Sequence, residues 1–598
     1  MNSETKTCQS CKSQFTVEAD DFEFYKKIAV PPPTWCPSCR MKRRLSFWNQ
    51  HNMYQRKCDA TGKTIFSIYR ADAPFPVYEK EYWFTDAWDP KQYGKAYDFD
   101  RSFFEQFKEL FSKVPRFHAS VEGMENSDYC ANAGHLKDCY LTFNASKCEQ
   151  CYYSVDVTDC KDCYDSTNLT SCELCYGCVG CFQCYGALFS IDCEDSHNIA
   201  FSRNLRGCSN CFGCVNLNKK EFYIFNVPYS KKEYEQKINE LWNGSFSSIP
   251  NISKRIQELY TQHPVRFAHQ RNTHETTGEH VYQSKNVKDG YFVKGGENLK
   301  YVQSLMVPPY AKDSYDYSVW GEDATLVYET YEAGLGVYDI QFCWDIWPSC
   351  TNLKYCISCH SSSDLFGCVG MRKGQYCILN KQYTKEEYEK MVARIKEQMN
   401  TMPYTDRAGR VYKYGEYFPS ELSPFGYNET WLQDYYPLTK EEATAQGYNW
   451  YDRTVKDFSM DIKAAELPDA IGGASDDIVK KIIGCAHSGP PAGGCRENCM
   501  VAFKILPQEY ALYKKMNVPL PRLCFNCRHV ERLRFKNKPG LFDRVCQCNG
   551  EQSEGGLYKN LVEHVHGAAH CSNQFRTPYA ADRPEIVYCE ACYQAEVV

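Results

Sequence analysis

Long apolar runs are missing from this 598-residue sequence. No stretch of about 18 consecutive apolar residues occurs, which argues against a membrane-spanning helix. The opening residues, MNSETKTCQSCK, also lack the apolar segment that directs export. We therefore expect a protein that stays in the cytoplasm.

An excess of charge of one sign is absent as well. The chain has 69 basic and 75 acidic residues, a net charge of −6 at pH 7. So small a net charge gives no global signature of nucleic-acid binding. The length exceeds what one hydrophobic core usually organises, so several domains are expected.

Common catalytic patterns are not found. The sequence contains no phosphate-binding loop, no strand-linked dinucleotide glycine motif and no zinc-protease or serine-hydrolase motif. A solenoid-groove enzyme would need paired carboxylates on adjacent coils, and Asp156, Asp159 and Asp165 fit turns better. We expect binding rather than catalysis, and keep the groove enzyme as a remote alternative.

Cysteine, in contrast, is abundant, with 36 residues. In a large chain without an export signal, metal binding by thiolates is a better explanation than disulfides. The two ends carry the same pattern of paired cysteines, which offers four thiolates for a closed tetrahedral zinc site. The predicted ligands are Cys8, Cys11, Cys36 and Cys39 at one end and Cys495, Cys499, Cys524 and Cys527 at the other.

These two ends are copies of each other. Cys11 matches Cys499 and Arg40 matches Arg528 at a constant offset of 488 residues, and Cys58 keeps the same register with Cys546. Such a long match indicates a duplication, so both ends are expected to have the same fold.

A third zinc site is predicted in the last segment, from Cys571, Cys589 and Cys592. Its fourth ligand is one of Cys546, Cys548, His564 and His566. We favour Cys548, because the CQCNG segment is typical of a ribbon knuckle.

The corresponding N-terminal site has lost its ligands. Glu79 and Tyr82 occupy the positions of Cys589 and Cys592, so Cys58 alone cannot hold a metal there. We expect packing to replace the ion.

The end modules resemble zinc-ribbon domains of the treble-clef-like kind. The resemblance rests on CxxC, a Phe four residues after the second Cys, an aromatic segment, and P-x-x-x-C-x-x-C followed by Arg, over about 40 residues at each end. The whole chain resembles multi-ribbon proteins of very small uncultured bacteria. The resemblance implies zinc and a cytoplasmic setting, and no activity.

Between the ends, CxxC pairs recur every twelve residues, at 148/151, 160/163 and 172/175. A short fixed period with polar turns predicts a parallel β-solenoid. Residues 211–238 match 365–392, and the second copy keeps the twelve-residue rhythm loosely. Each copy ends in a capping box, which predicts helices over 230–242 and 384–399.

Fifteen cysteines lie between residues 130 and 214. We interpret them as small inward-facing residues that pack in ladders, because the second copy replaces several of them with residues that bind no metal. Additional zinc between stacked pairs, disulfides and an iron–sulfur cluster remain alternatives.

The predicted fold is mainly β with short helices: two zinc-ribbon modules flank two duplicated parallel β-solenoid segments. The expected boundaries are an N-terminal ribbon module (1–95), a connecting helix (96–126), a solenoid (127–228), a helix and linker (229–281), a second solenoid (282–383), a helix and linker (384–475) and a C-terminal double ribbon (476–598).

The predicted function is that of a scaffold with about three structural zinc ions. It would bind an unknown macromolecule, either a protein or a nucleic acid, with no membrane contact. The alternative is binding to nucleic acid or the ribosome through the basic segments after each ribbon. The residues for this alternative are Arg40, Lys42, Arg43, Arg44, Trp48, Arg528, Arg532 and Arg534.

Overall fold

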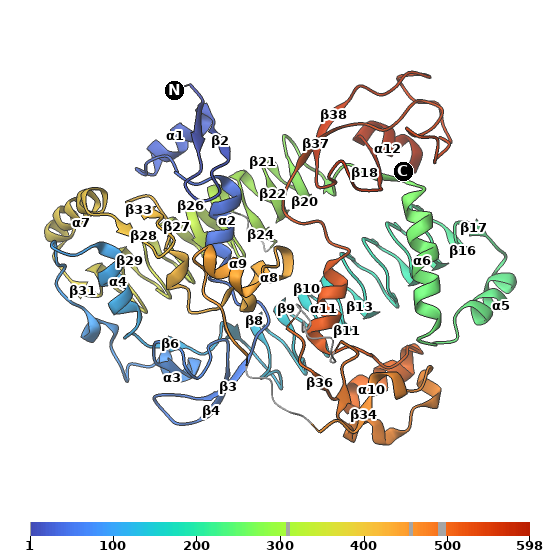
Figure 1. Cartoon of the computed structure of the whole chain (residues 1–598), viewed down its shortest axis with the longest axis horizontal. Coiled ribbons are helices and arrows are strands. Elements are labelled where there is room, and N and C mark those ends of the chain that lie inside the picture. Colours follow the sequence, from blue (N-terminus) through green and yellow to red (C-terminus); the bar gives the residue numbers. More distant parts are fainter. Residues whose placement is uncertain (1, 307–310, 454–458, 488–497, 598) are drawn as a thin grey trace. The chain divides into compact units, whose positions relative to one another are not determined.

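A computed structural model describes residues 2–306, 311–453, 459–487 and 498–597. The described chain is mainly β with 12 helices, and its middle forms a β-solenoid of about 21 turns, with cysteine clusters near both ends (Figure 1). The predicted fold class is therefore confirmed.

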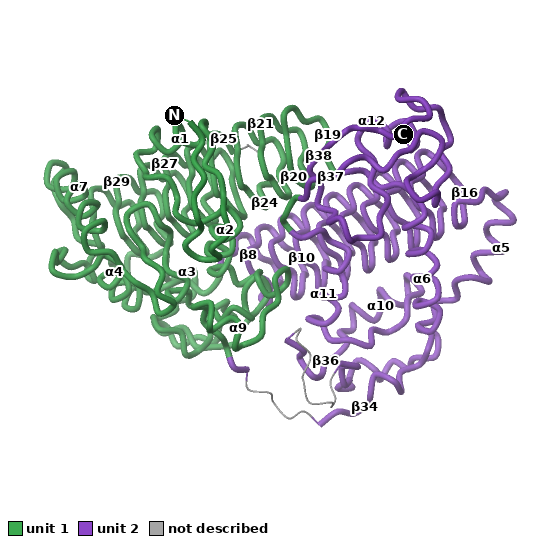
Figure 2. The backbone as a smooth tube through the Cα atoms, turned by 45° about the horizontal axis from the view of Figure 1, so that its top comes forward, with its two compact units in different colours: residues 1–119, 268–451, 539–541 green, residues 120–267, 452–538, 542–598 purple. Residues whose placement is uncertain are grey.

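The chain forms two compact units, and neither is continuous in sequence (Figure 2). Unit 1 comprises residues 1–119, 268–451 and 539–541. Unit 2 comprises residues 120–267, 452–538 and 542–598. Each unit thus combines one solenoid segment with a cysteine-containing module from a distant part of the sequence, and we keep the name ribbon for these two modules.

Unit 1 begins with strand hairpins and helices and continues with its solenoid. Its helices are α1 (Ala19–Lys27), α2 (Pro37–Leu45), α3 (Lys80–Trp83), α4 (Phe103–Phe111), α7 (Lys385–Thr401), α8 (Trp431–Tyr435) and α9 (Lys440–Ala445). Its strands outside the solenoid are β1 (Glu4–Thr7), β2 (Gln14–Val17), β3 (Tyr54–Lys57), β4 (Thr64–Ser67), β5 (Val77–Tyr78), β6 (Arg116–Phe117), β32 (Tyr404–Thr405) and β33 (Val411–Tyr412). Its solenoid strands are β19 (Gln270–Arg271), β20 (Gly278–Tyr282), β21 (Lys285–Lys288), β22 (Gly290–Lys294), β23 (Glu297–Lys300), β24 (Gln303–Leu305), β25 (Lys312–Ser318), β26 (Ala324–Tyr331), β27 (Val337–Gln341), β28 (Thr351–Lys354), β29 (Ser363–Phe366), β30 (Gln375–Ile378) and β31 (Lys381–Gln382).

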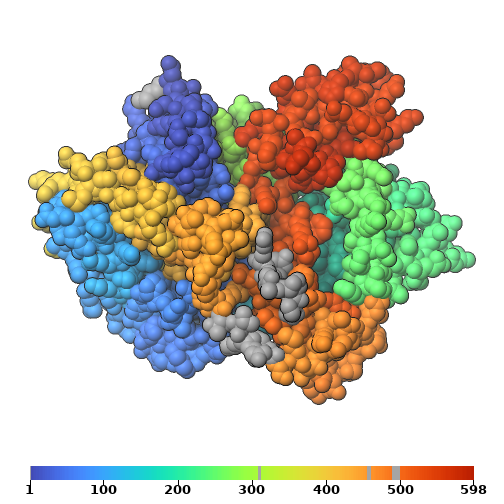
Figure 3. All heavy atoms as spheres, viewed as in Figure 1, coloured from blue at the N-terminus to red at the C-terminus, as the bar shows by residue number. Residues whose placement is uncertain are grey.

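Unit 2 has the same kinds of element in the reverse order along the chain. Its helices are α5 (Lys231–Leu241), α6 (Ser248–Thr261), α10 (Pro507–Met516), α11 (Phe525–Leu533) and α12 (Glu590–Val597). Its solenoid strands are β7 (Val121–Glu122), β8 (Ala131–Gly134), β9 (Phe143–Ser146), β10 (Val155–Thr158), β11 (Lys161–Tyr164), β12 (Thr167–Thr170), β13 (Glu173–Tyr176), β14 (His197–Ala200), β15 (Ser209–Phe212), β16 (Glu221–Ile224) and β17 (Val227–Pro228). The remaining strands are β18 (Pro264–Arg266), β34 (Ile462–Lys463), β35 (Ile483–Gly484), β36 (Ala502–Phe503), β37 (Phe542–Val545), β38 (Gln574–Thr577) and β39 (Ile586–Tyr588). Residues 542–597 form a rounded lobe in the space-filling view (Figure 3).

The unit 2 solenoid has twelve residues per turn. Phe143 pairs in parallel with Val155, and Val155 pairs with Thr167. Through most of this solenoid, every third residue is buried, and the residue just before it has a positive φ, as at Asp138 before Cys139. Asn, Asp and Gly tolerate this left-handed conformation best, which explains why they recur at the corners.

The unit 1 solenoid follows the same plan with longer turns. Lys312 pairs with Thr325 and Tyr338 pairs with Thr351, so these turns have thirteen residues. Thr351 pairs with Ser363 twelve residues later. Insertions in some of the turns therefore explain why the sequence rhythm is loose in this copy.

Both predicted capping boxes are present. Glu233 and Ser230 cap α5, and Glu387 and Thr384 cap α7, which places both helices within two residues of their predicted bounds. Ile395 of α7 is fully buried, whereas α5 buries none of its residues completely.

Candidate metal centres

The first ribbon brings its four predicted ligands together. Cys8 directly follows β1, Cys11 lies in the turn before β2, Cys36 precedes α2, and Cys39 lies in its first turn. Their sulfur atoms all lie within 4.8 Å of one another. The Cys36 amide donates a hydrogen bond to the Cys8 sulfur over 3.2 Å. This group can hold a metal ion.

Distances within the groups fit a tetrahedral zinc site. A Zn–S bond of about 2.3 Å puts two sulfurs of a tetrahedron about 3.8 Å apart, whereas a disulfide needs about 2.05 Å. The sulfurs of Cys11 and Cys36 are 3.7 Å apart, and those of Cys571 and Cys589 are 3.9 Å apart. No disulfide joins two cysteines in the described part of the chain.

A second group forms near the other end, with one member that was not predicted. Cys499, Cys524 and Cys527 converge as expected, and Cys485 is the fourth. Cys485 directly follows β35, as Cys8 follows β1, and the Cys524 amide donates to its sulfur over 3.2 Å. Cys495, the predicted ligand, lies outside the described residues.

The third group contains Cys571, Cys589 and Cys592, as predicted, and its fourth thiol is Cys546 rather than Cys548. Cys546 directly follows β37, and the Cys589 amide donates to its sulfur over 3.2 Å. The alignment of Cys58 with Cys546 was the sequence signal for this ligand.

Cys548 belongs to another set. It lies with His564, His566 and Cys592, and the ligand atoms of these four residues are within 4.8 Å of one another. The two sets share only Cys592.

The degenerate N-terminal site is held by hydrogen bonds. The Glu79 amide donates to the Cys58 sulfur over 3.3 Å, as amides do in the intact groups. The Glu79 carboxylate accepts from Thr61 over 3.1 Å and pairs with Lys63 at 2.9 Å. Polar contacts, rather than packing alone, therefore replace the ion.

Thiols in these groups hold their protons unequally. Hydrogen bonding from Cys36 lowers the pKa of the Cys8 thiol, and the same interaction from Cys546 lowers the pKa of Cys589 to about 4. Hydrogen bonding to Cys485 lowers the pKa of Cys524. Each group thus contains at least one thiol that loses its proton more readily than an isolated cysteine, which favours binding of a cation.

The basic segment after the first ribbon is buried, although the nucleic-acid alternative requires it to be exposed. Arg40 and Arg44 of α2 both reach Asp316 of the solenoid, at 2.8 and 3.0 Å. Arg43 pairs with Glu416 at 2.7 Å and with Glu329 at 3.2 Å. All three arginines are at most 1% exposed.

Two further residues of this segment are also engaged. Trp48 is fully buried and stacks on Trp431, with ring centroids 6.1 Å apart. The Lys42 ammonium lies 4.3 Å from the centre of the Tyr436 ring. Through these contacts, the basic segment attaches the first ribbon to the solenoid and to the later loops of unit 1.

The same contact recurs after the second ribbon. Arg528 and Arg532 of α11 both reach Asp165 of the unit 2 solenoid, at 2.5 and 3.1 Å. Arg534 is the exception, with a side chain 61% exposed and paired with Glu531. Seven of the eight residues proposed for nucleic-acid contact are therefore engaged within their own unit, and Arg534 is the most exposed of the eight.

Solenoid cysteines act as hydrogen-bonding groups in the core. In one ladder, Ser154, Ser166 and Cys178 follow one another at twelve-residue intervals. The Ser166 amide donates to the Ser154 hydroxyl over 3.2 Å, and the Cys178 amide donates to Ser166 over 3.3 Å. The Cys178 thiol in turn donates to backbone carbonyls. Small side chains that both donate and accept thus satisfy buried backbone groups.

The carboxylates considered for a groove enzyme are corner residues. Asp156, Asp159 and Asp165 all have positive φ values. Asp156 accepts from Asn144, and Asp159 accepts from Ser171, each one turn away. Asp156 and Asp159 thus stabilise turns, as the sequence indicated, whereas Asp165 pairs with arginines of α11.

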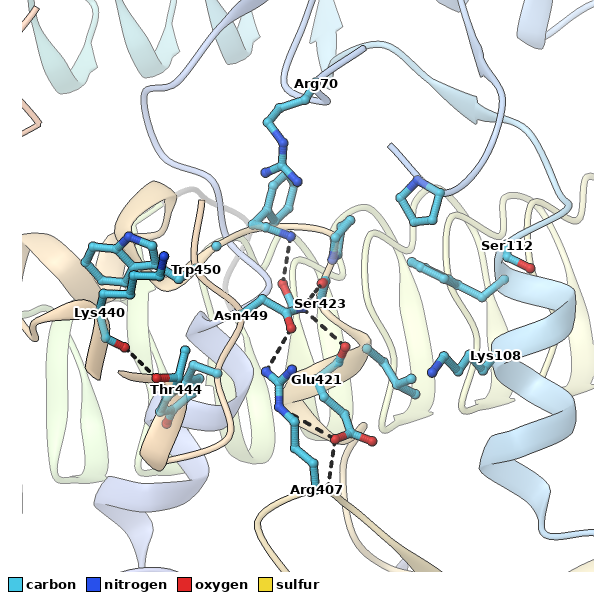
Figure 4. A pocket seen from close by; sticks show the side chains of 17 residues that line it. Arg70, Lys108, Ser112, Arg407, Glu421, Ser423, Lys440, Thr444, Asn449 and Trp450 are labelled. Atoms are coloured by element: carbon cyan, nitrogen blue, oxygen red, sulfur yellow. Dashed lines mark hydrogen bonds and ion pairs between the residues drawn. The ribbon is translucent and has the colours of Figure 1, made fainter. Parts of the chain in front are cut away.

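A cavity of about 550 Å³ lies in unit 1 (Figure 4). Several polar groups around it are engaged with one another: the Arg407 backbone amide donates to the Glu421 carboxylate over 2.9 Å, and the Arg407 guanidinium donates to Asn449 over 2.9 Å. This network fixes the loops around the cavity.

A comparison of the chain with models of known protein families finds no match, and a comparison with curated proteins finds none either. Among the described residues, no helix is both long enough and apolar enough to cross a membrane.

Proposed function

We propose that this chain is a zinc-stabilised scaffold that binds a macromolecular partner. Three structural zinc ions would fold the ribbons, and the ribbons would hold the solenoids. Sulfur–sulfur spacings close to those of a zinc tetrahedron, in groups with no place for a substrate, carry the proposal. A reducing cytoplasm would keep these thiols free.

The outer solenoid faces are the proposed binding surfaces. The arginines that follow the ribbons are used within their own units, so the ribbons offer few cations to a phosphate backbone. Exposed tyrosines on the solenoids, such as Tyr185 (46% exposed) and Tyr338 (51% exposed), suit contacts with a protein. We therefore propose a protein partner.

Metal analysis and partner capture test this proposal together. We expect at least three zinc ions per purified chain, and a strong chelator should unfold the ribbons and reduce the amount of partner that the native chain captures from its host extract. A chain that keeps its circular dichroism and its partner after losing all zinc would contradict the proposal. Salt-dependent binding to RNA or DNA would instead favour the nucleic-acid alternative.

A further inference from the structure

The last ribbon contains more metal-binding groups than one ion needs. Cys546, Cys571, Cys589 and Cys592 form one set, and Cys592 also belongs to the set with Cys548 and two histidines. We infer that this ribbon holds two metal ions of the zinc type, bridged by the Cys592 thiolate. The two sets together contain seven residues, and because both ions would bind Cys592, each ion has four ligands. Four ligands complete the tetrahedral coordination of zinc.

The first histidine is oriented for metal binding. His564 Nε2 lies 2.9 Å from a carboxylate oxygen of Glu596, and both side chains are at most 1% exposed. The Glu596 carboxylate also accepts from the backbone amides of Leu561 and Val562. This fixed carboxylate holds the proton on Nε2 and leaves Nδ1 free to coordinate, as in carboxylate–histidine–zinc arrangements.

The second histidine presents its other nitrogen. His566 Nδ1 lies 2.7 Å from the Ala569 carbonyl oxygen, so it carries the proton and donates. His566 Nε2 lies 3.4 Å from the Cys592 sulfur. In a tetrahedron with Zn–N of about 2.05 Å and Zn–S of about 2.3 Å, these two atoms are about 3.6 Å apart.

Cys548 and the charge balance support the second ion. Cys548 is fully buried, and its sulfur accepts a hydrogen bond from the Asn560 side-chain amide over 3.2 Å. With the four thiolates of the other set, the cluster would contain five negative charges when deprotonated. One divalent ion would leave an excess of three, and a second reduces it to one.

The segment that the second ion would fix has almost no apolar interior of its own. Leu557, Leu561 and Val565 are 66%, 76% and 98% exposed. A loop that buries so little apolar surface needs a disulfide or a metal to be ordered. Coordination by Cys548, His564 and His566 ties both ends of this loop to α12.

Removing both histidines tests the inference. The variant H564A/H566A should contain one zinc ion fewer than the wild-type chain, whereas H197A/H274A, which removes two exposed histidines elsewhere, should keep the full number. In cadmium-loaded wild type, ¹¹³Cd NMR should show a resonance from a mixed sulfur–nitrogen site next to those of tetrathiolate sites. This resonance should be missing from H564A/H566A and present in the control.

Two results would overturn the inference: an unchanged zinc content in H564A/H566A, or a wild-type cadmium spectrum with tetrathiolate resonances only. The inference rests on metal binding by the third four-thiol group, as proposed above. It fails separately from the scaffold proposal, because a chain with three tetrathiolate ions and no mixed site would leave that proposal intact.

Discussion

At the scale of single residues, the solenoid core shows why cysteine and serine alternate in one ladder. Cys178 occupies the same position as Ser166 one turn earlier and Ser190 one turn later. Both side chains are small and can donate to a carbonyl and accept from an amide, so either residue suits this position.

Cys178 therefore allows a test of hydrogen bonding against packing. We expect C178S to change the free energy of unfolding by less than about 1 kcal/mol, because a hydroxyl replaces the thiol in its contacts. C178V should cost about 1–3 kcal/mol, because it loses the thiol's hydrogen bonds to the Tyr176 and Ala187 carbonyls and adds a methyl group to a fully buried site. Urea denaturation measures both variants, and loss of zinc from C178S would support the alternative of metal in the solenoid.

His360 makes unit 1 sensitive to acid. Burial among Trp347, Trp83 and their neighbours lowers the pKa of His360 to about 3, and its Nδ1 lies against the Trp347 carbonyl. The unfolded chain takes up this proton near pH 6.5, so the stabilisation is complete above that value and decreases as the pH falls towards 3.

We expect wild-type stability to fall by about 2 kcal/mol more than that of H360Q between pH 7 and pH 5, because each pH unit between the two pKa values contributes about 1.4 kcal/mol. Urea denaturation of both proteins at pH 7, 6 and 5 measures the difference. If the free energy of unfolding fell by the same amount in both proteins between pH 7 and pH 5, His360 would not titrate in this way.

At the scale of elements, the two ribbon helices attach to their solenoids in the same way. In unit 1, Arg40 and Arg44 of α2 form ion pairs with Asp316. In unit 2, Arg528 and Arg532 of α11 form ion pairs with Asp165. Both aspartates lie at left-handed corners, with φ values of 52° and 50°. Such buried ion pairs fix the orientation of the ribbon helix on its solenoid more than they raise the free energy of unfolding. Removing one partner, however, leaves the charge of the other buried without compensation.

Substituting either aspartate should therefore be costly. We expect D316A and D165A each to destabilise the chain by about 3–5 kcal/mol, because two arginines lose a buried partner. Asp477, whose exposed side chain pairs with Lys480, provides the control, and D477A should leave the unfolding midpoint nearly unchanged. Thermal or urea unfolding would contradict this interpretation if all three variants behaved alike.

These elements also show what sequence reasoning can reach. The twelve-residue period, the capping boxes at Ser230 and Thr384 and the paired thiols are local patterns, so the solenoid, two helices and most ligands were predictable. The partners of the arginines were not, because Asp316 lies more than 270 residues from Arg44 and nothing local marks it. Cys485 was missed because Cys495 offered a tighter spacing to Cys499.

At the scale of the whole molecule, the ribbon and the solenoid of each unit lie on opposite sides of residue 267 in the sequence. The solenoid of unit 1 is completed by residues 1–119, and that of unit 2 by residues 452–538 and 542–598. Residues 267 and 268 mark the boundary between units. A chain cut at this bond would therefore place each solenoid and its own ribbon on different fragments.

We expect fragments 1–267 and 268–598 to be soluble when they are produced together and to aggregate when produced separately, because each alone lacks the partner of its solenoid. Copurification of an untagged fragment with a tagged one measures this. A monomeric, folded fragment 1–267 would contradict the expectation, since it would mean that the first ribbon can use Asp165 in place of Asp316.

Because the ribbon and the solenoid of each unit are far apart in the sequence, they are also synthesised at different times. The nascent chain exposes residues 120–267 long before translation reaches the cysteines and arginines that complete this unit. During that interval, the unfinished solenoid exposes the face that the last ribbon will cover. The first ribbon has already been made, and its helix α2 is similar to α11. It can therefore bind this face in place of the last ribbon. Correct assembly therefore depends on the early pairing being weak enough to dissociate, or on a chaperone that covers the face until the last ribbon emerges.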